Sequence, residues 1–133
     1  MFLLDTNIWL ELLLKQERAG EVQKLLQTHA APDFAMTEFS LYSIGVILTR
    51  LKKDELFADF LNDTVEDLSV LVIRLDMAGL SEALAVRRKF QLDFDDAYQY
   101  AAAAQYGLTL LSFDRDFDRT ERGRQTPADV MGS

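Results

Sequence analysis

The chain has 133 residues, of which 49% are hydrophobic, so it fits one ordinary domain with a sizeable core. It contains no cysteine, which excludes disulfides, thiolate metal sites and a cysteine nucleophile. Its one histidine, His29, is expected at the surface. If the protein is an enzyme, carboxylates must therefore do most of the catalytic work. A net charge of −8 disfavours phosphate binding, unless metal ions reverse the local field or a basic partner covers the acidic surface.

The first half of the chain alternates short apolar runs with helical patterns. In chain order these predict a strand over 2–4, a helix from about Ile8, a helix over 18–28, a strand over 34–36 and a helix over 38–52. A loop containing Pro32 separates the second helix from the second strand. Thr37 is the expected N-cap of the helix over 38–52, because a threonine hydroxyl can accept from a free backbone N–H there.

The second half continues the alternation. It predicts a helix over 54–62, a strand over 68–75, helices over 81–90 and 94–106, a strand over 108–111 and a last strand near 127–131. Gly107 suits the position that ends the helix over 94–106. Strands that alternate with helices predict an α/β domain, and continuous apolar runs are typical of parallel strands that are covered on both faces. We therefore expect three α/β/α layers around a mainly parallel sheet of four to five strands.

The sequence has no pattern of export or membrane insertion. The apolar run 8–14 is shorter than the ~20 residues that a membrane-spanning helix needs, and it contains Glu11. No cationic segment or cleavage site surrounds it. We expect a soluble, cytoplasmic protein that does not contact a membrane.

Acidic residues follow the apolar runs. Asp5 follows the first strand, Glu38 lies just past the second, and Asp114 closely follows the strand over 108–111, while Asp96 opens an alanine-rich helix. In an open parallel sheet, ligand sites form at the carboxyl ends of the strands, where the strand order reverses. Carboxylate oxygens are the ligands that Mg²⁺ prefers, and one or two such ions can align a water molecule for attack on a phosphodiester.

Each acid also has a structural alternative. Asp5 fits a turn or helix cap, and Glu38 in a first helical turn is favoured by the helix dipole. Asp93 is a reasonable N-cap that would put Asp96 at the third helical position, and Asp114 could cap a short segment over 115–118. Four acids after apolar runs, in a chain with a single histidine, are less easily explained as caps.

Four stretches together resemble the motifs of PIN domains, particularly those of VapC toxins from toxin–antitoxin pairs. They are LLDTNI (3–8), TEFS (37–40), DAYQYAAA (96–103) and LLSFDRDF (110–117). Their order and spacing hold from residue 2 to about 118, so the resemblance covers nearly the whole chain as a single PIN domain over 1–133.

The resemblance implies a catalytic quartet and a metal site. The quartet is Asp5, Glu38, Asp96 and Asp114, with the metal held by Asp5, Asp96 and Asp114. Four further residues would support the site, namely Thr6, Asp95, Ser112 and Asp116. Asp95 could replace Asp96 as a ligand, and Asp116 could replace Asp114.

The implied activity is that of a metal-dependent endoribonuclease that uses Mg²⁺ or Mn²⁺. Its substrates would be structured RNAs, and its partners an antitoxin and a second copy of the chain. The helix over 38–52 is apolar almost all round and would form the homodimer, while an antitoxin segment would lie beside the helix over 54–62. The alternative is that both helices only complete the core of a monomer.

RNA contacts have two candidate basic sets. One is Arg87, Arg88 and Lys89, and the other is Arg115, Arg119, Arg122 and Arg124, which is interleaved with acids and could instead be self-paired. Tyr98, Tyr100 and Tyr106 could stack on bases, or belong to the core or an interface. Ala97, Ala101 and Ala104 would let their helix lie close to the sheet.

Two other functions compete with the nuclease. A PIN fold that has lost catalysis would only bind RNA or protein, but all four acids are present. A phosphatase that forms an aspartyl-phosphate at Asp5 would need a second aspartate two residues later, where the chain has Asn7.

Overall fold

The computed structural model describes residues 1–29 and 33–131. Its elements are β1 (Phe2–Leu4), α1 (Thr6–Leu13), α2 (Ala19–Thr28), β2 (Phe34–Thr37), α3 (Glu38–Arg50), α4 (Asp54–Asp59), the π-helix η2 (Phe60–Asp67), β3 (Leu71–Ile73), α5 (Met77–Phe90), α6 (Phe94–Tyr106), β4 (Thr109–Leu111), the 3₁₀-helix η3 (Arg115–Arg119) and α7 (Pro127–Met131). Most of the loop expected around Pro32 lies outside the described residues.

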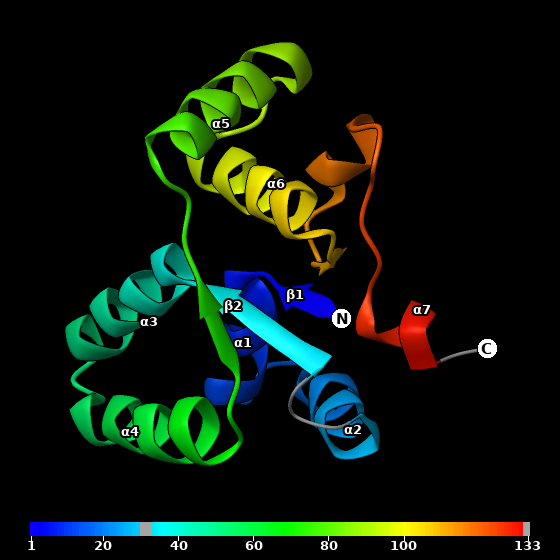
Figure 1. Cartoon of the computed structure of the whole chain (residues 1–133). Coiled ribbons are helices and arrows are strands. Elements are labelled where there is room, and N and C mark those ends of the chain that lie inside the picture. Colours follow the sequence, from blue (N-terminus) through cyan, green and yellow to red (C-terminus); the bar gives the residue numbers. More distant parts are fainter. Residues whose placement is uncertain (30–32, 132–133) are drawn as a thin grey trace.

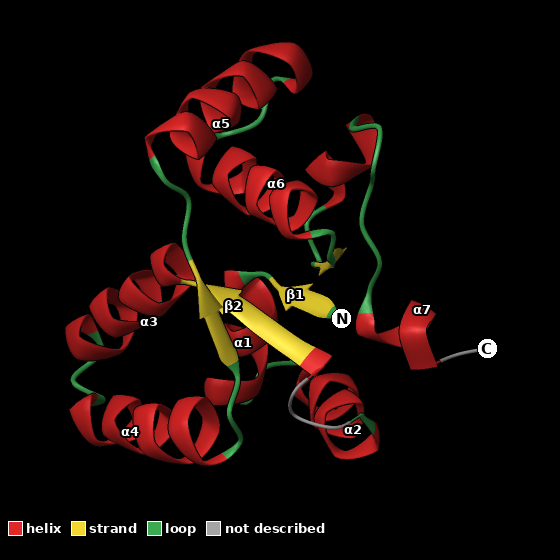
Figure 2. Cartoon of the chain, in the orientation of Figure 1, coloured by secondary structure: helices red, strands yellow, loops and turns green. Residues whose placement is uncertain are grey.

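The four strands form one parallel sheet in the order β3-β2-β1-β4. Helices α5 and α6 lie on one side of the sheet, and α1, α2, α3 and α4 lie on the other, as Figures 1 and 2 show. The predicted α/β/α architecture with a parallel sheet is therefore confirmed.

Alternate residues of each strand supply two separate cores. Leu3 of β1 and Ala35 of β2 point toward α5 and α6, where they join the alanines of α6. Leu4 and Met36 point to the opposite side and pack with α1 and α3 around Trp9. Burial on both faces explains why these strands read as continuous apolar runs.

The order in which strands are added to the parallel sheet reverses at β1. The chain builds β1, β2 and β3 outward on one side and then returns to place β4 on the other side of β1. Leu4 aligns with Leu111, and the backbone N–H of Asp5 donates to the carbonyl of Leu111 at 2.9 Å. The carboxyl ends of β1 and β4 therefore lie side by side, which is where open α/β sheets form ligand sites.

Helix caps set several boundaries. Thr37 caps α3 as predicted, because its hydroxyl accepts from the backbone N–H of Ser40 at 2.9 Å. Helix α5 begins at Met77, earlier than predicted, because the Asp76 carboxylate accepts from the backbone N–H of Gly79 at 2.8 Å. Gly107 ends α6 in the left-handed conformation, as expected.

The strand predicted near 127–131 is wrong, because this segment is helix α7. Thr126 and Asp129 form a reciprocal cap, in which each side chain accepts from the backbone N–H of the other at 3.1 and 2.9 Å. Pro127 then occupies the first helical position, where its fixed φ suits a helix. Strand-like pairing stops just before this cap, where Gln125 bonds to Leu110 and Ser112 at the outer edge of β4.

The segment predicted as a helix over 54–62 is α4 and the start of η2. Phe60 is 2% exposed and packs edge-on against Trp9 with ring centroids 5.5 Å apart, so part of this apolar side completes the core. His29, expected at the surface, is half-buried with its ring edge-on to Phe2 and Phe34. No helix within the described ranges has the length and apolar character to cross a bilayer.

Gly79 is required where α5 approaches α6. A Cβ at this position would lie 2.9 Å from Cβ of Leu75 and 3.0 Å from Oε1 of Gln105. Gly79→Ala should therefore lower the free energy of unfolding by about 1–3 kcal/mol, because overpacking outweighs the gain in helix propensity. Urea denaturation measures this. Gly20→Ala in α2 is the matched control, since nothing lies within 4 Å of its added methyl, and it should leave stability unchanged or raise it by up to about 1 kcal/mol.

Candidate metal centre

Asp5 lies at the end of β1 with its carboxylate 4% exposed. Its Oδ1 accepts from the backbone N–H of Thr6 at 2.8 Å and from Nε2 of Gln99 at 2.9 Å. Its Oδ2 accepts from the hydroxyl of Ser112 at 2.7 Å. Burial raises the pKa of Asp5, and the hydrogen bonds from Gln99, Ser112 and Thr6 oppose that rise.

Ser112 joins the end of β4 to the end of β1. Besides donating to Asp5, its Oγ accepts from Nδ2 of Asn7 at 3.1 Å and from the backbone N–H of Asp114 at 3.0 Å. Oδ1 of Asn7 in turn accepts from the backbone N–H of Phe113 at 3.2 Å. These bonds hold the turn that carries Asp114 against the turn that carries Asp5.

Gln99 ties α6 to the same network, and the sequence did not single it out. It is 3% exposed, its Nε2 donates to Oγ of Ser40 at 2.7 Å as well as to Asp5, and its Oε1 accepts from Oγ1 of Thr37 at 2.7 Å. Thr6, predicted as a supporting residue, contacts Ser40 through its hydroxyl at 2.7 Å. The available signal was spacing, because a residue three positions after Asp96 lies on the same face of the helix.

Three acids of the predicted quartet, together with Asp95, line one cavity of about 210 Å³ at the carboxyl ends of β1 and β4. Its lining residues are Asp5, Thr6, Asn7, Leu10, Phe39, Asp95, Asp96, Gln99 and Asp114. Asp96, Asp114 and Asp116 each offer a carboxylate oxygen within 4.8 Å of the other two. Burial raises the pKa of Asp96 to about 8, with further contributions from the nearby Asp5, Asp95 and Asp114 carboxylates.

The two neighbouring acids differ in their surroundings. Asp95 is exposed, lines the same cavity, and groups with Asp93 and Asp96 within 4.8 Å. Asp116 accepts from Arg119 at 3.2 Å and does not line the cavity. Asp95 therefore belongs to the cavity wall with Asp96 and Asp114, whereas Asp116 lies next to these acids without lining the cavity.

In the part of the chain that the structure describes, Glu38 is not among the acids that line the cavity or form the acidic clusters. It opens α3 and is half-buried. Its carboxylate neighbours the hydroxyl of Tyr42, whose pKa is raised by partial desolvation and by this acid. The assignment of Glu38 to the catalytic quartet stays a prediction.

The donor set of the cavity fits a hard divalent cation. Its charged groups are carboxylates, which match the oxygen preference of Mg²⁺ and Mn²⁺, and it contains neither the thiolate nor the imidazole that softer metals prefer. Burial is the main cause of the raised pKa of Asp96, and the neighbouring carboxylates of Asp5, Asp95 and Asp114 add to it, an addition that a bound cation would offset. The chemistry of the cavity thus suits a divalent cation, and the assignment of Asp5, Asp96 and Asp114 as its ligands stays a prediction.

Comparison with known proteins shows the family to which the chain belongs. A model of the PIN domain matches residues 2–123. The chain belongs to the PIN domain family. This confirms the resemblance seen in the four motifs. No curated protein matches the sequence.

Solved structures share the PIN fold over nearly the whole chain. A toxin–antitoxin complex from Klebsiella pneumoniae is 23% identical over 96% of this chain and 98% of that one, with a TM-score of 0.73. FitAcB from Neisseria gonorrhoeae is 21% identical over 96% and 98%, with a TM-score of 0.75. The toxin VapC20 from Mycobacterium tuberculosis, described as cleaving the sarcin–ricin loop, is 20% identical over 89% and 93%, with a TM-score of 0.73. At these identities the likeness establishes the fold.

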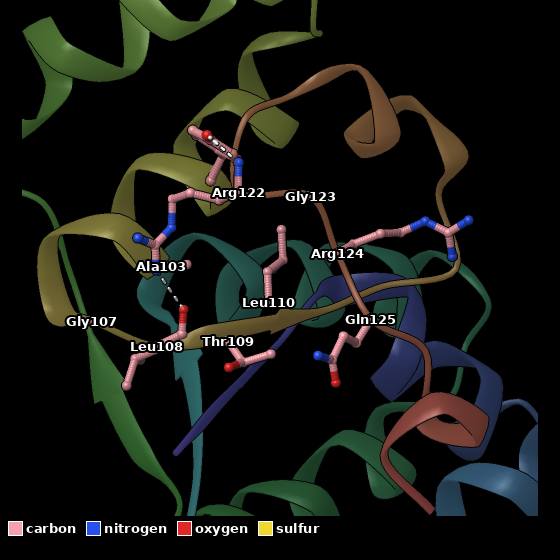
Figure 3. A pocket seen from close by; sticks show the side chains of 10 residues that line it. Ala103, Gly107, Leu108, Thr109, Leu110, Arg122, Gly123, Arg124 and Gln125 are labelled. Carbon is pink, nitrogen blue, oxygen red and sulfur yellow. Dashed lines mark hydrogen bonds between the residues drawn. The ribbon is translucent and has the colours of Figure 1, made fainter. Parts of the chain in front are cut away.

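The second basic set of the PIN domain is largely committed to internal contacts. Figure 3 shows Arg122 and Arg124 beside a hollow of about 330 Å³ along β4, with Arg122 donating to the carbonyl of Leu108 at 3.1 Å. Arg124 pairs with Asp118 at 3.1 Å, and Arg119 donates to the carbonyls of Phe90 and Gln91. Pairing with the interleaved acids therefore holds for Arg119, which also pairs with Asp116, and for Arg124, while Arg122 is bound to the backbone. Arg115 is exposed, as are Arg87, Arg88 and Lys89, and Lys89 pairs with Glu121 at 2.7 Å.

Most of the candidate stacking tyrosines have structural roles. The buried Tyr98 accepts from the backbone N–H of Leu75 at 2.9 Å, and the buried Tyr100 accepts from that of Arg122 at 3.1 Å. Tyr106 is exposed. Of the three alanines expected to pack closely, Ala97 and Ala101 are buried, whereas Ala104 is exposed.

The raised pKa of Asp96 predicts a pH-dependent loss of stability in metal-free protein. Because the folded-state pKa of about 8 exceeds the ordinary 3.8, folding favours the protonated form, and this contribution is lost as the pH rises through about 8. The difference in stability between Asp96→Asn and the wild type should therefore grow in favour of the variant as the pH rises from 5 to 9. Thermal unfolding in a chelator at several pH values measures the difference.

The control for this prediction is Asp63→Asn, which removes one exposed carboxylate of η2 away from the cavity. It should not reproduce the rise. A difference between Asp96→Asn and the wild type that stays flat across this pH range would contradict the electrostatic account of the site.

Proposed function

We propose that this PIN domain is a metal-dependent endoribonuclease of the VapC kind that hydrolyses RNA phosphodiester bonds. The observation that carries the proposal is the convergence of Asp5, Asp96 and Asp114, which are distant in sequence, on one cavity at the reversal point of the sheet. Membership of the PIN family supports it. So does the similarity of fold to proteins described as toxin–antitoxin complexes and, in one case, as a toxin that cleaves the sarcin–ricin loop.

We assign the metal to Asp5, Asp96 and Asp114, with Thr6, Ser112, Asp95 and Asp116 in support. A Mg²⁺ or Mn²⁺ ion held there would polarise a water molecule for attack on phosphorus and offset charge on the leaving oxygen. The chain contributes rigidity, because Ser112 and Asn7 fix the Asp114 turn relative to Asp5. Burial of Asp5 keeps water from competing for its carboxylate.

Substitution of a central acid tests the assignment. Asp5→Asn and Asp96→Asn should each lower the rate of RNA cleavage roughly 100-fold or more, because each loss weakens the hold on an ion worth several kcal/mol in the transition state. RNA cleavage by the purified variants measures this, with Asp63→Asn as the control that should cleave like the wild type. A chelator should abolish wild-type cleavage, and added Mg²⁺ or Mn²⁺ should restore it.

The same experiment separates the nuclease from a binding module. Wild-type protein that binds RNA but never cleaves it, with or without metal, would favour the catalytically degenerate alternative. Cleavage retained by both Asp5→Asn and Asp96→Asn would contradict the proposed roles of Asp5 and Asp96.

We further propose that a second copy of the chain covers the exposed side of α3. Tyr42 is 62% exposed and Val46 is 46% exposed, and with Phe39, Ser43 and Ile47 they line an apolar hollow of about 450 Å³. Contiguous apolar surface that is exposed to solvent often marks a site of interaction with another protein. An antitoxin is the second proposed partner, and the solved complexes that share the fold support it.

Introducing a charge at the α3 hollow tests the homodimer. Val46→Glu should convert a dimer to a monomer, because it would place an unpaired carboxylate in an apolar interface. Sedimentation equilibrium measures the change in mass. Ala58→Glu, at an exposed position of α4, is the control that should leave the dimer intact. A wild type that is already monomeric at high concentration would refute this interface.

A further inference from the structure

The amide of Gln99 lies between three elements of the fold. It projects from α6 one turn after Asp96 and makes hydrogen bonds to Asp5 after β1, to Thr37 at the end of β2 and to Ser40 in α3. Because it is buried, these three protein groups must satisfy its amide. An arrangement that uses both N–H donors and the carbonyl oxygen leaves the side chain with one orientation.

The direction of each bond follows from the partners. The backbone N–H of Ser40 already donates to Oγ1 of Thr37, so the threonine proton is free to point to Oε1 of Gln99. A reversed amide would instead put Oε1 against Oδ1 of Asp5, two acceptors 2.9 Å apart. The NH₂ group of Gln99 therefore faces the Asp5 carboxylate.

Counting acceptor sites shows what remains free on Asp5. Each carboxylate oxygen can accept about two hydrogen bonds. Oδ1 receives two, from the backbone N–H of Thr6 and from Gln99, so it is fully used. Among the described residues, Oδ2 receives one, from Ser112, and the Ser112 proton points there because its oxygen accepts from Asn7 and Asp114.

We propose that Gln99 is a positioning residue, which occupies Oδ1 of Asp5 so that this carboxylate binds a divalent cation through Oδ2 alone. The inference rests on the proposed metal site and goes beyond it, because it names the oxygen and the side chain that selects it. Without Gln99, Oδ1 regains a free acceptor site, and the carboxylate loses one of the donors that fix its rotation. A ligand that is less well oriented binds its metal more weakly.

Metal affinity tests the proposal directly, without relying on RNA cleavage. Gln99→Leu keeps the size of the side chain but removes its donors, and it should weaken Mn²⁺ binding about 10- to 100-fold, the range found when groups that orient metal ligands are lost. Isothermal titration of the purified chain with Mn²⁺ measures the dissociation constant. Thermal unfolding of the same sample shows whether it is folded.

Tyr98→Phe is the matched control on the same helix. It also removes a buried polar contact, the hydroxyl that accepts from Leu75, but it does not touch the cavity. It should lower the melting temperature while leaving Mn²⁺ affinity within about twofold of the wild type. A residue that mattered only for packing would behave like Tyr98, so equal Mn²⁺ affinity in folded Gln99→Leu and wild type would overturn the proposal.

Two further variants keep the test decisive. Thr37→Val removes the bond that orients the Gln99 amide, and it should weaken Mn²⁺ binding by a smaller factor; if Gln99→Leu does not fold, unchanged affinity in Thr37→Val overturns the proposal instead. In an Asp5→Asn background, Gln99→Leu should add no further loss, because its effect passes through Asp5. An additive loss would contradict that route.

The outcomes also separate this inference from the function on which it rests. Wild-type protein that binds no Mn²⁺ would contradict both the proposed metal-dependent nuclease and the proposed role of Gln99. If the wild type binds Mn²⁺ and cleaves RNA, and folded Gln99→Leu binds Mn²⁺ with equal affinity, only the proposed role of Gln99 is contradicted. The proposed nuclease activity would then still stand.

Discussion

The burial of one carboxylate, that of Asp5, links the fold to the site. Removing a carboxylate from water costs several kcal/mol unless hydrogen bonds replace its hydration. Asp5 receives its donors from three places in the chain: the first turn of α1, the end of β4 and the middle of α6. The pairing of β1 with β4 and the packing of α6 on the sheet must therefore both form before this charge is stabilised.

Asp5 and Asp96 face the same cavity in opposite surroundings. Burial raises the pKa of both acids, but the hydrogen-bond donors around Asp5 oppose the rise, whereas the carboxylates of Asp5, Asp95 and Asp114 add to it at Asp96. Acids with raised pKa values that share one cavity are typical of catalytic sites. A cation near Asp96 would supply the positive charge that its protein neighbours do not.

Local patterns in the sequence were sufficient to predict the sheet and the edge of the sheet at which several acids meet. Apolar runs located all four strands, and the acids that follow them marked the edge at which Asp5 and Asp114 meet. The strand predicted near 127–131 was wrong although the signal for a helix is local. Thr126 and Asp129 cap α7, whereas the apolar Val130 and Met131 suit a strand as well as a helix.

The supporting network could not be predicted in the same way. Asn7 and Ser112 are 105 positions apart, and Gln99 and Asp5 are 94 apart, so their hydrogen bonds exist only once the chain is folded. A single glutamine in an alanine-rich helix carries no local signal of its partners. Glu38 begins α3 as the sequence predicts, and its carboxylate lies beside the hydroxyl of Tyr42, a neighbour one helical turn away that the sequence analysis did not consider.

The two edges of the sheet are protected unequally. The outer edge of β4 is occupied by the backbone of Gln125, which bonds to Leu110 at 2.9 Å and to Ser112 at 3.0 Å. In the described part of the chain β3 pairs with β2 alone, and its Leu71 is 48% exposed. The pairing groups of the sheet that lack a strand partner in the described part of the chain are therefore those of β3, so an extended peptide that joined the sheet would be expected there rather than beside β4.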